Sequence, residues 1–262
     1  QSEETTAAAK KEAYKKTEQV ITDLQVLLFA GETAERHNLL GSVYKRLALL
    51  ATDSKKRINA YKNAISHYET AYFHDYNSNK IYSLSNSIEL ACLLVLSEAV
   101  NHGGEFTVNR KKYKLRSVAE AQQLLLELQN KITEKAEIDD LDYWSFIAFL
   151  NIDLCLLLII EDEKIETKWN EVIQNFKKIW QKAGSEAKKA AELEHLEFLT
   201  RSLNTIAEIE TEAYKPQADL EKRINDLRTA LNSVRKELKS KKAEKSPLPK
   251  SPKPKAKQKP KK

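Results

Sequence analysis

Glu192 and His195 form the spacing in this chain that comes nearest to a catalytic motif. An E-x-x-H on a helix puts both side chains on one face, and di-iron carboxylate centres take two of their ligands from such a pair. These centres also need a second E-x-x-H and two further inward-facing glutamates. The sequence has no second pair, so we expect no metal role for Glu192 and His195.

The remaining histidines and both cysteines fall into no ligand pattern. The chain has neither an H-E-x-x-H nor a Cys-His arrangement, so we expect no zinc site. Cys92 and Cys155 lie in strongly apolar segments, whereas a nucleophilic cysteine needs a polar, electropositive setting. We expect buried, reduced thiols, which favours a cytoplasmic location. The histidines concerned are His37, His67, His74 and His102.

Phosphate-binding loops are also missing from the sequence. Gly103 and Gly104 are the one pair of adjacent glycines, and they lie in neither a G-x-x-x-x-G-K-S/T nor a G-x-G-x-x-G arrangement. Those arrangements let backbone amides surround a phosphate. We therefore expect no cofactor and no enzymatic activity.

Basic residues are concentrated in the segment RKKYKLR, which we expect to be a loop. A concentration of this kind binds phosphate or an acidic partner surface, and an ordinary solvated loop is the plainer interpretation. The candidate polyanion-binding residues here are Arg110, Lys111, Lys112, Lys114 and Arg116, arranged around Tyr113.

The C-terminus is a second basic region. Eleven lysines and one acid give residues 239–262 a net charge of +10, and because the whole chain carries +6, the remainder carries −4. Residues 242–262 alternate lysine with proline and have too few apolar side chains to fold, so we expect a disordered tail. Such a tail can bind nucleic acid weakly through phosphates, or serve as a linker. Its candidate contacts include Lys250, Lys253, Lys255 and Lys257.

A heptad pattern occupies residues 217–241, just before this tail. Apolar residues repeat there at intervals of four and three with charged residues between them, which is typical of a coiled-coil helix. The pattern spans under three heptads, so we favour a last helix that caps the fold, with self-association or docking to a partner helix as the alternative. The positions are Leu220, Ile224, Leu227, Leu231, Val234 and Leu238.

The rest of the chain indicates an all-α fold. All six prolines lie at or after Pro216 and the chain has five glycines, so residues 1–215 carry few strand-turn signals. The longest apolar run has seven residues, far below the roughly 20 that cross a membrane, so we expect no membrane contact. Apolar residues recurring every three or four positions predict helices over 14–28, 33–50, 58–72, 81–95, 118–132, 141–159, 169–179 and 187–206.

The second and third of these helices carry the most informative pattern. Leu40, Gly41 and Tyr44 on one, with Ala64, Tyr68 and Ala71 on the next, occupy the small-residue and aromatic positions of a tetratricopeptide helix hairpin. Gly41 would allow close approach of the two helices. Such hairpins stack antiparallel into an α-solenoid whose usual work is protein binding. The sequence therefore favours a protein-protein interaction scaffold over a nucleic-acid-associated protein.

Four longer segments of the sequence resemble those of a known family. GETAERHNLLGSVYKRLA, HYETAYFHDYNSNKIYSLSNSIELACLL, DLDYWSFIAFLNIDLCLLL and HLEFLTRSL occur in an order that resembles the tetratricopeptide-type TRAFs-binding domain. That domain is found in apoptosis signal-regulating kinases and beside effector domains of bacterial conflict systems. The resemblance covers about residues 30–206 and implies a regulatory scaffold for an effector.

The expected organisation follows from these segments. We expect an N-terminal helix over residues 1–31, a tetratricopeptide-like helical domain over 32–210, the heptad helix and the tail. The chain starts at Gln1 and contains no methionine, which leads us to expect a piece of a larger signalling or conflict-system polypeptide.

Overall fold

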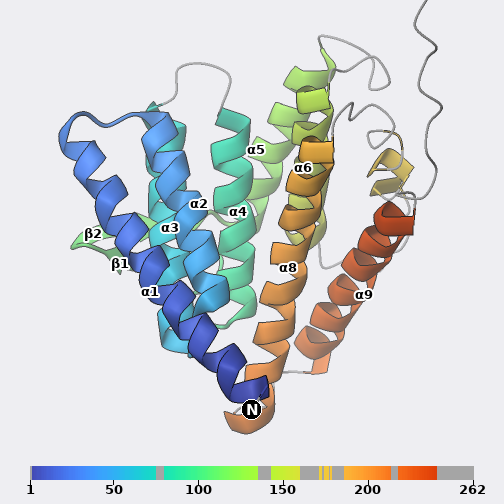
Figure 1. The fold of residues 1–262 in the computed structure, drawn as a ribbon. Coiled ribbons are helices and arrows are strands. Elements are labelled where there is room, and N and C mark those ends of the chain that lie inside the picture. The colour runs from blue at the N-terminus through green and yellow to red at the C-terminus, as the bar shows by residue number, and fades with distance from the viewer. Residues whose placement is uncertain are drawn as a thin grey trace, which may run out of the picture.

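The computed structural model describes residues 2–74, 80–134, 143–159, 171, 172, 174–176, 178, 186–213 and 218–240. Its helices stack antiparallel in chain order, which confirms the all-α solenoid expected from the sequence (Figure 1). The helices are α1 (Ser2–Phe29), α2 (Ala34–Leu50), α3 (Ser54–His74), α4 (Lys80–Leu96), α5 (Val118–Thr133), α6 (Tyr143–Ile159), α8 (Glu186–Ala213) and α9 (Ala218–Ser240).

The turn between α1 and α2 is shaped by Gly31, Thr33 and Arg36. Gly31 follows α1 with a φ of +138°, a region that side-chain-bearing residues rarely adopt. The Thr33 hydroxyl then accepts a hydrogen bond from the Arg36 backbone N–H at 3.2 Å, which makes Thr33 the N-cap of α2. The Arg36 guanidinium donates to the carbonyl oxygens of Leu27 and Gly31 and holds the turn closed.

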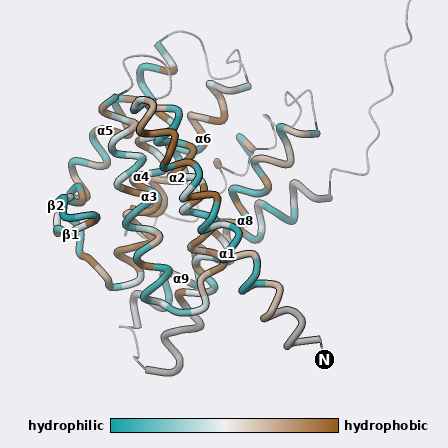
Figure 2. The backbone as a smooth tube through the Cα atoms, turned by 60° about the vertical axis from the view of Figure 1, so that its left-hand side comes forward, coloured by the Kyte–Doolittle hydropathy of each residue, from teal (hydrophilic) through white to brown (hydrophobic). Residues whose placement is uncertain are grey.

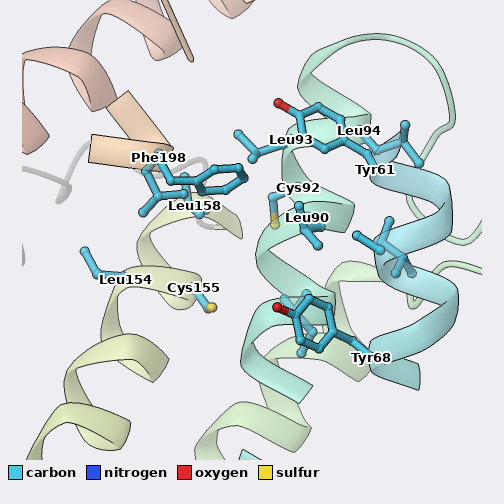
Figure 3. Close-up of a cluster of buried hydrophobic side chains, with 14 of the residues drawn as sticks. Tyr61, Tyr68, Leu90, Cys92, Leu93, Leu94, Leu154, Cys155, Leu158 and Phe198 are labelled. Carbon is cyan, nitrogen blue, oxygen red and sulfur yellow. The ribbon is translucent and has the colours of Figure 1, made fainter. Parts of the chain in front are cut away.

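The core is continuous from α1 to α9. Helix α4 packs against α3 on one side and α6 on the other, which is why its sequence becomes apolar all round. Figure 3 shows Tyr61 and Tyr68 of α3, leucines of α4 and α6, and Phe198 of α8 in one cluster. Cys92 and Cys155 lie in this cluster as buried thiols that are not joined in a disulfide. Figure 2 shows hydrophobic residues concentrated within the helical stack.

The segment expected to be a basic loop is instead an antiparallel β-hairpin, so that prediction was wrong. Strands β1 (Glu105–Val108) and β2 (Lys111–Lys114) pair with Val108 opposite Lys111. The two residues between them, Asn109 and Arg110, have φ values of +49° and +67°. Positive φ at both central positions defines a type I′ turn, whose twist matches that of paired strands.

The hairpin is anchored to the helices by one apolar face and one ion pair. Phe106, Val108 and the following Leu115 are buried in the core. Arg116 then makes a bidentate ion pair with Glu69 of α3, with 2.8 Å between Nη2 and Oε2. Glu69 also accepts a hydrogen bond from Ser87 of α4. The hairpin is therefore fixed against α3 rather than free in solvent.

The second half of the chain continues the helical stack. Ser117 and Glu120 form a capping box that starts α5. Of the helix expected over 169–179, the described residues 171, 172, 174–176 and 178 are helical, and Val172 and Phe176 are buried. Trp169 and Ile179 lie outside the described residues.

Helix α9 packs along α8, the position expected of a capping helix (Figure 1). Of the heptad positions, Leu227 and Leu231 are almost fully buried in the core. The Arg228 side chain donates to Asn204 of α8 at 2.7 Å, and Arg235 pairs with Glu197 at 3.2 Å. The side chains of Leu220, Ile224, Val234 and Leu238, and the whole of residues 242–262, lie outside what the structure describes. Among the described residues, no helix is long and apolar enough to span a membrane.

Candidate functional site

The helix-pairing residues bring α2 and α3 into close contact. Leu40, Ala64, Tyr68 and Ala71 are completely shielded from solvent, and Tyr44 is nearly so. A Cβ atom placed on Gly41 would lie 2.8–3.0 Å from the ring of Tyr68, closer than real Cβ contacts. The Tyr68 hydroxyl lies 3.0 Å from the Ser42 hydroxyl, which fixes the ring in this position. Gly41 thus sets the spacing between the two helices.

A polar cleft of about 430 Å³ opens beside this helix pair. Helix α1 forms one wall, α2 and α3 form the floor, and the tip of the β-hairpin closes one side. The lining combines amide, hydroxyl and charged side chains with the rings of two tyrosines. It comprises Tyr14, Glu18, Ile21, Thr22, Gln25, Tyr44, Leu47, Lys56, Asn59, Ala60, Asn63, Thr107, Val108 and Asn109.

Tyr44 connects the cleft with a group of histidines. Its hydroxyl lies 3.4 Å from the amide nitrogen of Gln25 on α1, and its ring stacks on His67 of α3 with 5.5 Å between centroids. His67 Nδ1 in turn lies 3.0 Å from His37 Nδ1 of α2. One end of the cleft therefore contacts a pair of imidazoles, of which His37 is buried and His67 is half-buried.

We call Glu32, His37, His67 and His74 the histidine cluster. His74, the last residue of α3, stacks on His37 with 5.8 Å between centroids. Glu32 Oε2 lies 3.5 Å from His74 Nε2 and 3.8 Å from His37 Nε2. One carboxylate thus faces two imidazoles at the end of the helix pair.

Burial is the main cause of the lowered pKa values of His37 and His67. Burial and the charge of His37 lower the pKa of His67 to about 4. Burial also lowers the pKa of His37, although the Glu32 carboxylate opposes this shift. Lys111 of β2 adds a further, smaller lowering of the His37 pKa.

Sequence spacing did not predict this cluster, because Glu32 and His74 are forty-two positions apart. The antiparallel pairing of α2 and α3 brings the start of one helix beside the end of the other. His67 and His74 are seven residues apart, two helical turns, so both face the start of α2. The predicted pairing of these two helices therefore implies that His67 and His74 lie near the start of α2.

Comparison with known families finds a match in the N-terminal third of the chain. Residues 1–94 match the family described as Tetratricopeptide Repeats-Sensor. These helices are therefore similar to a tetratricopeptide domain, and we call residues 1–94 the tetratricopeptide-type domain. The match spans α1, α2, α3 and α4 to within two residues of its end. Comparisons with curated proteins and with solved structures give no match.

A buried charged network ties the tetratricopeptide-type domain to α8. Lys45 of α2 lies 2.9 Å from Glu89 Oε1 and 2.7 Å from Asn86 Oδ1, both on α4. The other Glu89 oxygen is 3.0 Å from His195 Nε2 of α8. The Lys45 ammonium also lies 4.3 Å from the ring centroid of Phe198. Burial raises the pKa of Glu89, but His195 and Lys45 oppose it and lower that pKa to about 2.

Glu192 and His195, the nearest approach to a catalytic motif, have separate surroundings. His195 faces Glu89, whereas the buried Glu192 has one carboxylate oxygen without a hydrogen-bond partner. Burial raises the pKa of Glu192. Lys45 joins α2 to Glu89 of α4 and His195 joins the same carboxylate to α8, so the geometry fits an ionic joint between helices.

The candidate polyanion-binding residues fall into three groups. Arg110, Lys111, Lys112 and Lys114 are exposed on the hairpin, and Lys112 lies 3.8 Å from Glu105. Arg116 forms an ion pair with Glu69, and this carboxylate balances its charge. Lys250, Lys253, Lys255 and Lys257 lie outside the described residues.

Proposed function

We propose that this chain is a non-enzymatic regulatory module that binds a protein partner in the cleft between α1, α3 and the β-hairpin. The cleft itself is the observation that carries the proposal. It lies within the tetratricopeptide-type domain apart from the hairpin tip, and domains of this class typically bind proteins.

The lining of the cleft suits an extended peptide. Asn59 and Asn63 are one turn apart on α3, and Gln25 faces them from α1. Side-chain amides both donate and accept hydrogen bonds, so they can pair with the backbone of a peptide whatever its side chains. Asn63 already donates to the Asn59 carbonyl oxygen at 2.8 Å, which orients its amide. Glu18 and Lys56 add one charge of each sign at the rim.

The resemblance to the TRAFs-binding domain supports a place in regulation. We propose that the chain is the regulatory part of a larger signalling or conflict-system polypeptide and works in the cytoplasm. The name of the matching family, Tetratricopeptide Repeats-Sensor, agrees with a role that couples recognition to an effector.

A displayed library of random peptides tests the binding site. Thr22 is exposed and lines the cleft, so Thr22→Trp should fill it without disturbing the core. Gln19→Trp, on an exposed part of α1 outside the lining, is the matched control. Peptides selected on the wild-type chain should bind Gln19→Trp and fail to bind Thr22→Trp. Equal binding to both variants would contradict the proposed site.

A second candidate function is polyanion binding, favoured by the four exposed basic residues on one hairpin. Together with the lysine-rich tail they would contact phosphates without reading a base sequence. Affinity for DNA or RNA should then fall by about a thousandfold or more between roughly 50 and 200 mM salt. Replacing Lys250, Lys253, Lys255 and Lys257 by Gln should reduce the slope of affinity against salt. A salt-independent affinity would exclude this function.

A further inference from the structure

We propose that Glu32, His37 and His74 form a binding site for a divalent transition metal of the zinc type. The side chains come from the α1–α2 turn, the first turns of α2 and the last residue of α3. One ligand atom from each lies within 4.8 Å of the other two. Two imidazoles and one carboxylate are a donor set that zinc accepts.

The distances are close to those of a formed site. Four-coordinate zinc with bonds of about 2.0–2.2 Å separates its ligand atoms by roughly 3.4 Å. The Glu32 oxygen lies 3.5 Å from His74 Nε2 and 3.8 Å from His37 Nε2. Small side-chain rotations of the two exposed members, Glu32 and His74, would complete the geometry.

His37 supplies an independent reason to expect a ligand. Its Nε2 atom is buried and has no hydrogen-bond partner, although buried polar atoms are nearly always paired. The same atom points toward the Glu32 carboxylate. A metal ion bound between them would satisfy this nitrogen.

His67 acts as a positioning residue for His37. Metal-bound histidines usually direct their second ring nitrogen to a hydrogen-bond partner, which fixes the tautomer and the ring. His37 Nδ1 lies 3.0 Å from His67 Nδ1. When His37 donates a proton there, its Nε2 carries the lone pair that a metal needs.

Charges around the site affect how strongly it should bind a metal cation. The C-terminus of α3, where His74 lies, favours a cation. Arg36 is turned away to the carbonyl oxygens of Leu27 and Gly31. Three protein ligands leave a fourth position for water or for a group from a bound partner.

Zinc titration of the full chain, without a histidine tag, tests the site. Competition with a chromogenic chelator should show one zinc ion per chain. Glu32→Gln and His74→Ala should each weaken zinc binding by at least the roughly 10–100-fold that outer-shell changes cause. Glu35→Gln is the matched control, since Glu35 is exposed and lies outside the cluster.

Cobalt provides a second readout. Co²⁺ in this site should give the visible absorption of a four-coordinate ion, and the bands should disappear in Glu32→Gln and His74→Ala. Both side chains are largely exposed, so circular dichroism should show the same unfolding midpoint as in the metal-free wild type. Wild-type zinc affinity in both variants, or no saturable binding by the wild-type chain, would overturn the proposal.

Discussion

Lys45 and Glu89 lie 2.9 Å apart across the boundary between α2 and α4, and both side chains are almost entirely removed from water. A charge in such a place is tolerated because its partner is present. With His195 on the far side of Glu89, this pair makes the position of α8 depend on the tetratricopeptide-type domain.

Lys45→Met should destabilise the protein by about 3–5 kcal/mol, because it leaves the Glu89 carboxylate buried without its ammonium partner. Urea unfolding followed by circular dichroism measures this change. Lys55→Met, at an exposed position of α3, should stay within about 0.5 kcal/mol of wild type. Equal effects of the two substitutions would show that Lys45 and Glu89 are not coupled.

Stability should fall in acid through Glu89. Its pKa in the folded chain is about 2, below the ordinary 4.5, so its contribution is complete above about pH 4.5 and is lost as the pH falls toward 2. Urea midpoints measured between about pH 6 and pH 3 should decline less steeply in Glu89→Gln than in wild type. Parallel declines would assign the acid sensitivity to other carboxylates.

Gly41→Ala should destabilise the chain. This is the opposite of the usual effect, because replacing glycine by alanine inside a helix normally stabilises a protein by about 0.5–1 kcal/mol. The added Cβ would meet the fixed ring of Tyr68, and overpacking of this kind costs about 1–3 kcal/mol. In a Tyr68→Leu background the ring is gone and the penalty should disappear. Additive effects in this double-mutant cycle would contradict the contact.

The helices were predictable because each has a clear apolar period and few interruptions. The hairpin was not, because type I′ turns favour Asn-Gly and this chain has Asn109 followed by Arg110. Strand β2 is also mostly lysine, a composition that is typical of a solvated loop. The alternation of polar and apolar residues in β1, Glu-Phe-Thr-Val, was an available signal.

The sequence patterns could not predict which side chains far apart in the sequence contact one another. Nothing near Lys45 marks it as the partner of Glu89, since that pairing depends on how α4 is rotated against α2. The histidine cluster is intermediate: helix pairing predicts that His37 approaches His67, but the convergence of Glu32 depends on the geometry of the Gly31 turn.

Arg110→Gly should stabilise the hairpin, because Arg110 has a φ of +67° that costs a side-chain-bearing residue on the order of 1 kcal/mol. The hairpin carries buried Phe106 and Val108, so the gain should appear in the unfolding midpoint of the whole chain. Arg110→Ala removes the same charge and keeps the Cβ, so it should bring no gain. A gain in both would point to charge rather than backbone conformation.

The family match ends at residue 94, inside α4, whereas the packing does not end there. One side of α4 faces α3 and the other faces α6, and leucines on α4 join both to a single core. The part of this protein that matches the family is therefore smaller than the packed core. A fragment cut at residue 94 would expose the face of α4 that packs against α6, so it would need another surface to cover that face.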